Sequence, residues 1–493
     1  MAGTPKHKDR LSAVDASFLA REAGTHMHIG GVLVFEGPPP AREDFEEHVS
    51  SRLHMVPRYR QKLAHPRLEM GRPMWIDDPS FNLGYHVRHS ALPSPGSEHE
   101  LRQLVGRIFS QRLDRSKPLW EIWLVEGLED NRFAVISKVH HSLVDGISGV
   151  DLTTVMFDTG PEGTPDLPAG ESWRPHEEPS DRELIADGVK GLVKLPFGLA
   201  RKAVSMVAHP ATTLESVREA AEGMGEVMWS MVNPAPKTPL NGDIGTHRRV
   251  LWVETSLSEL KEIKDGLGGT VNDVFLTVVA SSLQKWLHSR GIRTEGLQLR
   301  GCVPVSIRPK GEEAALGNRI TMMMGPLPVY ANSPRERYRI VRESMAGLKE
   351  SKQAQGAEMI ANLQDFAPPT ILAQASRLNF SNRFYNLLVT NVPGPQFPIY
   401  LLGRELLQLR PVAFLAPRNA LAVAIMSYNG SVFINLIGDY DAMPDLDRLA
   451  AYVAESIAEL RELAAETAPR RPAARASRNG SNARRAPKAQ PSM

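Results

Sequence analysis

The stretch KVHHSLVDGISG, residues 138–149, places two histidines side by side and an Asp-Gly pair shortly after them. The residues that lead into it, 133–141, have the composition and alternation of a β-strand. Because successive side chains of a strand point to opposite faces, we expect His140 and His141 on opposite sides of a sheet. The stretch therefore predicts a strand that ends at two histidines which do not face each other.

The residues after the histidines predict a tight turn. Asp145 and Gly146 are both favoured in turns, so the chain would fold back and bring a carboxylate near the strand end. A chelating pair of histidines is not expected, because the imidazoles point apart and lack the i,i+4 spacing of a helical zinc site. The sequence therefore predicts no metal site here, and a carboxylate that orients either the loop or an imidazole.

A histidine at this position suits proton transfer, because the ordinary pKa of imidazole is near 6.5. No nucleophile accompanies it. Residues 146–150 (GISGV) lack the last glycine of a G-x-S-x-G elbow, and Ser142 adjoins His141 too closely for a dyad. Cys302, the only cysteine, has no nucleophile signature around it. Base catalysis on a bound hydroxyl is the simplest functional interpretation; the alternative is a pair of hydrogen-bonded polar residues at a strand end.

Length and composition predict a globular protein of two lobes, since 493 residues exceed the usual size of one domain. The apolar fraction of 42% and the charged fraction of 23% are typical of soluble proteins, and no apolar run approaches the ~18 residues of a membrane span. Residues 1–22 carry charges where a secretory signal needs an apolar stretch, and a single cysteine excludes an internal disulfide. We therefore expect a cytoplasmic protein.

Two segments rich in proline and glycine, 157–181 and 233–242, interrupt the periodic patterns and predict linkers. Between them, residues 184–207 combine apolar and basic side chains in an amphipathic pattern, which either packs on the protein itself or docks on a lipid surface. The expected organisation is a first lobe, a linker with a helical connector, a second lobe and a disordered basic tail, at residues 1–160, 161–245, 246–465 and 466–493.

The tail carries seven basic residues from Arg470 onward and no acidic residue. Such a composition cannot bury enough apolar surface to offset the entropy lost on ordering, so we expect disorder. The tail either keeps the protein soluble or is attracted to an anionic surface. No folded nucleic-acid-binding motif accompanies it, and we expect no nucleic-acid partner.

Periodicity in both lobes predicts mixed α/β structure. Apolar residues at helical spacing predict helices at 42–63, where Pro57 perturbs the pattern, and at 101–113, 270–291 and 445–460. Short apolar stretches predict strands at 28–37, 132–141, 248–257 and 299–309.

These motifs together resemble a known family. The sequence HHSLVDG, residues 140–146, is similar to the HHxxxDG signature of CoA-dependent acyltransferases, the superfamily of chloramphenicol acetyltransferase and of condensation domains. The surrounding sequence resembles bacterial wax ester synthase/diacylglycerol acyltransferases from Leu11 to about Leu463. The matching segments, in family order, are LSAVDASFL, RPMWIDDPSFNLGYHVR, RLDRSKPLWEIWLVEGL, GGTVNDVFLTVVA, VPVSIRP, LGNRITMMM and TNVPGP.

This resemblance implies a fold and a catalytic signature. The fold would be two α/β lobes similar to chloramphenicol acetyltransferase, joined by a helical connector, with an active-site tunnel between them. His141 would be the general base, next to His140 in the signature, while Gly146 allows the turn. Asp145 would form a structural ion pair with Arg308.

The resemblance also implies residues near the substrates. Asn272 and Asp273 match an Asn-Asp pair that lies near the active site at the start of a helix. Pro118, Leu119 and Trp120 would shape the acyl pocket or a contact between lobes, because none of them can carry a proton.

The activity implied is the transfer of a long-chain acyl group from acyl-CoA to diacylglycerol, giving triacylglycerol, or to a fatty alcohol, giving wax ester. Acyl-CoA would be a substrate and no cofactor would be needed. The alternatives are an acyltransferase of the same fold with another lipid or polyketide hydroxyl as acceptor, and a catalytically silent lipid-droplet protein. The substrates also suggest peripheral association with the inner membrane face or lipid droplets.

Overall fold

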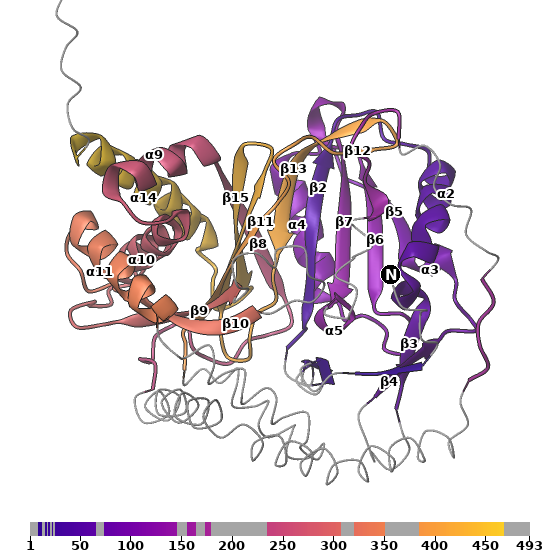
Figure 1. The fold of residues 1–493 in the computed structure, drawn as a ribbon, viewed down its shortest axis with the longest axis horizontal. Helices are drawn as coiled ribbons and strands as arrows, with labels where there is room; N and C mark the ends of the chain where they lie inside the picture. The colour runs from indigo at the N-terminus through magenta and orange to yellow at the C-terminus, as the bar shows by residue number, and fades with distance from the viewer. Residues whose placement is uncertain are drawn as a thin grey trace, which may run out of the picture.

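The computed structural model describes eleven stretches of the chain, which are 8–11, 15–16, 18–19, 22, 25–65, 73–144, 155–163, 173–178, 234–306, 320–350 and 384–467. Two sheet-containing lobes lie side by side in it (Figure 1). The predicted amphipathic segment 184–207 and nearly all of the predicted tail lie outside the described residues. The mixed α/β class that the sequence predicts is confirmed.

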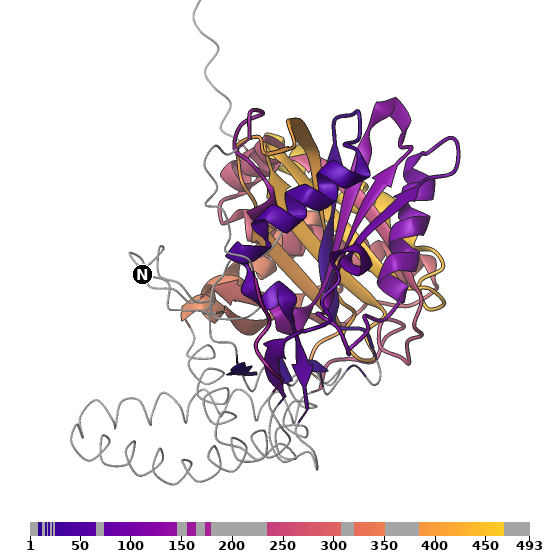
Figure 2. The ribbon, with the colours of Figure 1, turned by 90° about the vertical axis from the view of Figure 1, so that its right-hand side faces the viewer.

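The first lobe is built on a six-stranded sheet with strand order β12-β13-β2-β7-β6-β5. Its strands are β12 Tyr400–Leu401, β13 Arg404–Val412, β2 His28–Phe35, β7 Phe133–His140, β6 Trp120–Glu126 and β5 Val87–Ala91. All neighbours pair antiparallel except β5 and β6. Its helices are α2 Arg42–Arg52, α3 Leu83–His86, α4 Glu98–Ser110 and α5 His141–Val144. Helix α2 crosses the outer side of this sheet (Figure 2) and buries Phe45 and Val49 there.

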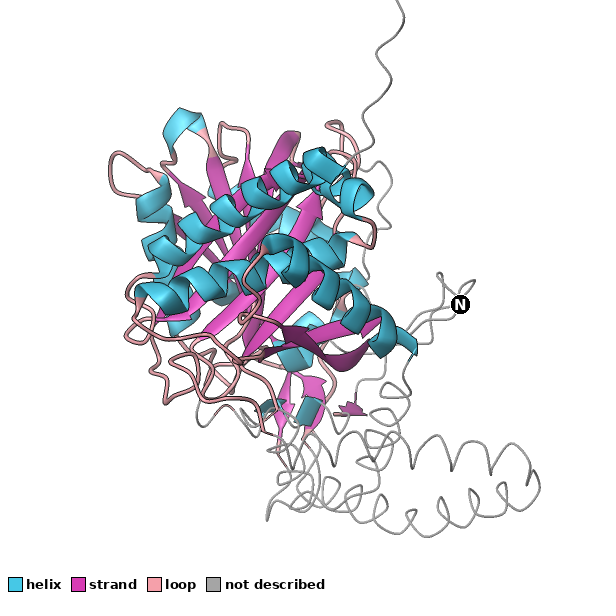
Figure 3. Cartoon of the chain, turned by 90° about the vertical axis from the view of Figure 1, so that its left-hand side faces the viewer, coloured by secondary structure: helices cyan, strands magenta, loops and turns pink. Residues whose placement is uncertain are grey.

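The second lobe has its own six-stranded sheet, with order β10-β9-β11-β14-β15-β8. Its strands are β10 Ile320–Leu327, β9 Leu299–Ser306, β11 Leu387–Pro393, β14 Leu421–Tyr428, β15 Ser431–Asp439 and β8 Arg248–Ser256. Its helices are α9 Leu257–Leu267, α10 Val271–Ser289, α11 Pro334–Glu350 and α14 Leu446–Thr467, and they cover the outer face of the sheet (Figure 3). A small third sheet joins β1 Lys8–Arg10, β4 Met74–Asp77 and β3 Gln61–Ala64.

The second half of the chain contributes strands to the first sheet. Strand β13 pairs with β2 from Leu406↔Phe35 to Val412↔Gly30, and β12 extends the same sheet. The chain then returns to the second sheet as β14. The predicted second lobe, 246–465, must therefore be corrected, because residues 400–412 within it belong to the first sheet. Pairing between distant segments has no signature in local periodicity.

A buried apolar cluster joins the two lobes. Val32 and Ile136 reach it from the first sheet, while Val250 and Ala424 reach it from the second. Helix α4 lies between the sheets and adds Val105 (Figure 1). Each sheet thus buries its inner face against the other lobe, which is the way a sheet with one apolar face completes its core.

The predicted helices differ in their outcome. The helix expected at 42–63 is wrong in its second half, since α2 ends at Arg52 and Pro57 begins a 3₁₀ turn that leads into strand β3. Proline lacks the N–H that a helix interior needs. The helix expected at 270–291 is confirmed by α10, Val271–Ser289.

One glycine in β2 allows the backbone of the neighbouring strand β7 and the Phe109 ring of α4 to approach closely. A methyl group on Gly30 would come 1.8 Å from the Ser137 carbonyl oxygen and 3.1 Å from the Phe109 ring. At Gly31 the nearest atoms would lie at ordinary contact distances, 3.5 Å and beyond. The neighbouring backbone therefore leaves no room for a side chain at Gly30, whereas it leaves room for one at Gly31.

We predict that Gly30→Ala lowers the free energy of unfolding by about 1–3 kcal/mol, because backbone atoms must move to relieve the overlap. Gly31→Ala, the matched control, is expected to change it by less than about 1 kcal/mol. Urea unfolding of both variants measures the difference. Equal midpoints for the two variants would contradict the prediction.

No single helix among the described residues is long and apolar enough to cross a membrane. The pair α9 and α10 passes that test only when taken together, and the two helices are bent by 95° relative to each other.

Candidate active site

The two adjacent histidines lie where β7 ends and α5 begins. His140 is the last residue of the strand and pairs across the sheet with His28. His141 begins the helical turn, and its main-chain N–H donates a 2.9 Å hydrogen bond to the Met27 carbonyl. The backbone of the turn is therefore attached to strand β2 and its approach.

His141 faces the region between the lobes. Its ring stacks on Phe18, with centroids 4.1 Å apart, and meets the edge of Phe414 at 5.6 Å. Both phenylalanines belong to the cluster that joins the lobes, whereas Val139 belongs to the core of the first lobe. The predicted alternation is thus correct up to His140 and wrong for His141, because the strand ends before that residue. The residue as a whole remains partly exposed, although Nδ1 of its ring is buried.

His140 is enclosed instead. Only 1% of it is exposed, and its Nδ1 accepts a 3.2 Å hydrogen bond from the Ser142 N–H and lies 2.7 Å from the Ser142 hydroxyl. Burial lowers the pKa of His140 to about 4, so the ring is neutral at neutral pH. A neutral ring whose Nδ1 accepts a hydrogen bond must carry its proton on Nε2.

A buried carboxylate lies beside His140. Oε1 of Glu22 is 3.1 Å from Nε2 of His28 and 3.8 Å from Nε2 of His140. Oε2 of the same group accepts a 2.7 Å hydrogen bond from Nε of Arg115 and forms an ion pair with its Nη2 at 2.6 Å. Burial opposes ionisation of Glu22, but its basic and imidazole partners outweigh burial and lower its pKa to about 2. The carboxylate is therefore charged at neutral pH.

Two further buried groups complete this region. Burial and the nearby Arg248 lower the pKa of His26 to about 4, and its ring stacks on that of His28 at 5.4 Å. Lys138, fully buried two residues before His140, donates to the Ile108 and Gln111 carbonyls at the end of α4. Burial lowers the pKa of Lys138 to about 8, and the amine satisfies carbonyls that the helix leaves unpaired.

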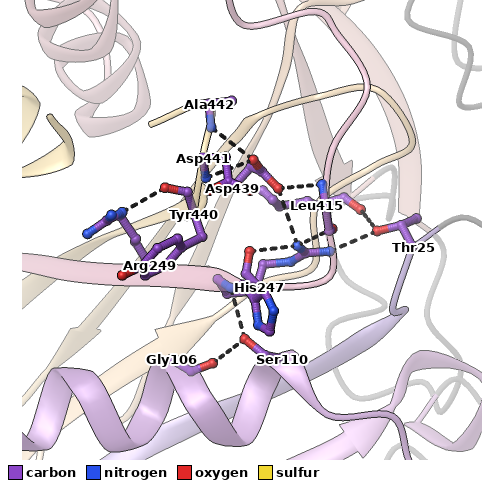
Figure 4. A network of polar contacts seen from close by, with 12 residues as sticks. Thr25, Gly106, Ser110, His247, Arg249, Leu415, Asp439, Tyr440, Asp441 and Ala442 are labelled. Atoms are coloured by element: carbon purple, nitrogen blue, oxygen red, sulfur yellow. Dashed lines mark hydrogen bonds and ion pairs between the residues drawn. The ribbon is translucent and has the colours of Figure 1, made fainter. Parts of the chain in front are cut away.

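Arg248 joins the lobes and lies near enough to His26 to affect its pKa. Figure 4 shows Thr25, Leu415 and Asp439 of the same network. Its guanidinium donates to Thr25 at 3.3 Å and to the Gly245 carbonyl at 2.8 Å, and lies 3.7 Å from the Asp439 carboxylate. The Thr25 hydroxyl in turn donates to the Leu415 carbonyl at 2.9 Å. Burial lowers the pKa of Arg248 to about 10, so it stays charged at neutral pH. The strand that carries His28 is thereby tied to the second lobe.

The segment Pro118-Leu119-Trp120 leads into β6, which lies beside β7 on the side opposite to β2. The Leu119 carbonyl accepts a 3.0 Å hydrogen bond from the main-chain N–H of His140. Trp120 is fully buried, and its indole N–H donates to the Tyr59 carbonyl at 2.8 Å. Leu119 and Trp120 belong to the core of the first lobe, so the structure gives them a role in packing and strand alignment.

The predicted Asn272–Asp273 pair lies in the second lobe, in the first turn of α10. Asp273 forms a capping box with Thr270, accepting from its N–H at 2.7 Å and from its hydroxyl at 2.8 Å. The structure thus explains Asp273 as a helix cap. A contact of Asn272 or Asp273 with substrate stays a prediction.

Three predicted site residues, Asp145, Gly146 and Arg308, lie outside the described residues, so the predicted ion pair between Asp145 and Arg308 stays a prediction. In the part of the chain that is described, no group of three or more His, Cys, Asp or Glu residues is arranged to hold a metal ion.

Sequence reasoning missed several members of this region. Glu22, Arg115 and Phe18 are brought to the histidines only by packing of segments far apart in the chain. His26 and His28 carried a signal in their spacing of two, which in an extended chain places both side chains on one face, and His28 pairs with His140 across the sheet.

Comparison with known proteins places this geometry in a family. Residues 11–275 match the wax ester synthase/diacylglycerol acyltransferase catalytic domain, and residues 316–461 match the C-terminal domain of the same family. A probable diacylglycerol O-acyltransferase of Mycobacterium tuberculosis is 32% identical over 458 residues, which cover 92% of this chain and 96% of that protein. A second probable diacylglycerol O-acyltransferase of that organism is 31% identical over 466 residues, covering 92% and 99%.

Solved structures agree with this placement. The wax ester synthase/diacylglycerol acyltransferase from Marinobacter aquaeolei VT8 superposes with a TM-score of 0.64 at 26% identity, covering 92% of this chain and all of that one. The starter condensation domain of rhizomide synthetase, at a TM-score of 0.57 and 13% identity, covers 93% and 95% and shows the shared fold alone. The chain, which carries His-His at the end of a central strand in two lobes of this fold, belongs to the wax ester synthase/diacylglycerol acyltransferase family.

Proposed function

We propose that this enzyme transfers a long-chain acyl group from acyl-CoA to the free hydroxyl of diacylglycerol, with His141 as the general base. The observation that carries the proposal is the position of His141, at a strand end between the lobes and against Phe18 and Phe414. The M. tuberculosis relatives that are named diacylglycerol O-acyltransferases support the acceptor.

The proposed chemistry needs one base and no further catalyst. His141 takes the proton of the acceptor hydroxyl while its oxygen attacks the thioester carbonyl, and the C–S bond then breaks. The imidazolium returns its proton to the departing CoA thiolate, which leaves an ester and free CoA. No cofactor enters this scheme, because the thioester already supplies an activated acyl group.

The apolar surroundings of His141 support ester formation over hydrolysis. Phe18 and Phe414 shield two sides of the imidazole, and both lie in the buried cluster between the lobes. A water-poor site favours the bound alcohol over water as the group that attacks the thioester. A long acyl chain would also gain from an apolar environment, at roughly 0.8 kcal/mol for each buried CH₂.

The products identify the acceptor. Purified protein is incubated with labelled palmitoyl-CoA and either dioleoylglycerol or hexadecanol, and the lipids are resolved by chromatography. We expect triacylglycerol as the main product and wax ester as a second one, since the family is named for both activities. If neither lipid forms while CoA is released, the acceptor assignment is wrong and the enzyme acts on another hydroxyl or on water.

We further propose that the enzyme is cytoplasmic and associates peripherally with a membrane or lipid-droplet surface, because its acceptor is a lipid. The basic tail and the amphipathic segment 184–207 provide the sequence basis for this part of the proposal. Flotation with anionic vesicles tests it, and binding that is unchanged after removal of both segments would eliminate that basis.

A further inference from the structure

The structure contains a chain of polar side chains, buried from Glu22 onward, that the catalytic scheme does not use. It runs from Arg115 through Glu22 to His28 and His140, and it ends at Ser142, directly after His141. Glu22 is 4% exposed and His28 is 2% exposed, so both were removed from water on folding. Burial of charged and polar groups costs free energy unless their partners are well placed.

Arg115 determines which way the carboxylate faces. Its Nε and Nη2 both approach Oε2 of Glu22, and Nη2 also donates to the Leu19 carbonyl at 2.7 Å. The other oxygen, Oε1, is thereby directed at the imidazoles of His28 and His140. Phe18, which stacks on His141, immediately precedes Leu19 in the chain.

The carboxylate and Ser142 together determine the proton positions on the rings. An ionised oxygen only accepts hydrogen bonds, so Nε2 of His28, which lies 3.1 Å from Oε1 of Glu22, must carry its proton. For His140 the same tautomer follows independently from Nδ1, which accepts the Ser142 N–H. Burial keeps both rings neutral, with the pKa of His28 lowered to about 3 and that of His140 to about 4.

This arrangement holds the turn on both sides of His141. On one side, the ring of His140 faces Glu22; on the other, Ser142 is tied back to that same ring. The main chain of His141 itself is bonded to Met27, the neighbour of His28. A shift of the His140 ring would therefore move the backbone from which the His141 imidazole projects.

We propose that Glu22, oriented by Arg115, is a positioning residue that holds His28 and His140 in their Nε2–H tautomers and so sets the placement of the His141 imidazole. The inference rests on the proposed role of His141 as the base. It also assigns His140 a positioning role rather than a catalytic one, because its Nδ1 accepts the Ser142 N–H and its Nε2 is enclosed, 3.8 Å from the Glu22 carboxylate.

The decisive variant is Glu22→Gln, which keeps the shape and removes the charge. Arg115 attracts the amide oxygen, so the amide NH₂ is turned toward the histidines and offers donors where the carboxylate offered an acceptor. Nε2 of His28 must then lose its proton to Nδ1, so that it can accept a hydrogen bond from the amide. We expect kcat for triacylglycerol formation to fall about 10–100-fold, since small misplacements of a reacting group have effects of this size. KM for palmitoyl-CoA should stay within about twofold.

Asp158→Asn is the matched control. Asp158 is also a buried carboxylate paired with an arginine, at 2.9 Å from Arg52, but it lies at strand β12, and the histidine of its network is His48 rather than His28 or His140. We expect it to reduce thermal stability to a similar extent and to leave kcat within about twofold. A fall in kcat that is equal in Glu22→Gln and Asp158→Asn would reduce Glu22 to a merely structural residue and overturn the proposal.

A second readout is independent of activity. In protein with ¹⁵N-labelled histidine, the ring nitrogen shifts distinguish the two neutral tautomers, and His28→Gln and His140→Gln variants assign the signals. We expect neutral Nε2–H rings for both residues at pH 6, and a change of tautomer for His28 in Glu22→Gln. An Nδ1–H or imidazolium form of His140 in the unmodified protein would overturn the proposal.

The two readouts separate the possible failures. If the unmodified protein makes no ester, or if His141→Ala remains active, the proposed function is wrong and the ring shifts alone decide the role of Glu22. If the unmodified protein is active, His141→Ala is inactive and Glu22→Gln is normal, only the positioning role is wrong. Should Glu22→Gln fail to fold, Arg115→Lys replaces it, with an expected intermediate loss of kcat because Lys lacks the forked donor pair.

Discussion

His141→Ala is expected to lower kcat for ester formation by about 10²–10⁴-fold, because the variant lacks the group proposed to take the hydroxyl proton and return it to CoA. The remaining activity would come from holding both substrates together. The measurement is the initial rate of CoA release and of triacylglycerol formation from palmitoyl-CoA and dioleoylglycerol, with a thermal melt of each protein. The melt should change little, since the residue is partly exposed and its side chain lies at the edge of the cluster between the lobes.

His141→Phe separates the chemistry from the packing. A phenyl ring preserves stacking against Phe18 and Phe414 but carries no nitrogen. We expect the Phe variant to be as inactive as the Ala variant while retaining more stability. If the Phe variant kept most of the activity, His141 would be a packing residue and the base would have to be sought elsewhere.

Arg248→Met is expected to have the largest effect on stability, about 3–5 kcal/mol in the free energy of unfolding. The variant removes a buried guanidinium and leaves Asp439 with a charge that its partner no longer balances. Asp439 retains backbone donors, at 2.7 Å from Gly245 and 3.0 Å from Ala442, so we expect a destabilised protein that still folds. Urea unfolding measures the change. Because the Thr25 contact is lost as well, activity should decline along with stability.

The adjacent arginine supplies the control. Arg249 is drawn in the same network (Figure 4), but it lies at the surface, over the ring of Tyr440 at 3.8 Å, and donates to the Tyr440 carbonyl. Arg249→Met should change the free energy of unfolding by about 1 kcal/mol or less, as expected for an exposed cation–π contact. Similar losses in the two variants would mean that Arg248 does not join the lobes in the way its contacts indicate.

Local patterns predicted those features of the fold that depend on near neighbours in the chain. The alternation before His140 predicted strand β7, and apolar spacing predicted helix α10 at Val271–Ser289. Both succeed because strands and helices repeat every 2 and 3.6 residues. The helix expected at 42–63 ends at Arg52, and the regular helix does not resume after Pro57, which perturbs the pattern in the sequence and begins a 3₁₀ turn in the structure.

The candidate site was predicted only in part. The signature HHSLVDG located His140 and His141, and the family it resembles is the one that the comparisons show. The assignment of His140 as catalytic stays a prediction, beside the positioning role proposed above. The environment of His141 differs from the expectation because the strand ends one residue earlier. The ends of strands depend on tertiary contacts, which leave no period in the sequence.

By itself, then, the sequence determined the family, the mixed α/β class and the identity of the paired histidines, because each follows from motifs or periodicity within short stretches of the chain. Only the tertiary structure decided that residues 400–412 complete the first sheet, that Arg248 ties Thr25 to the second lobe, and that Glu22 faces His140. These contacts join segments more than a hundred residues apart. Their formation depends on how buried surfaces and charges fit together in three dimensions, and the spacing of residues along the chain does not report that fit.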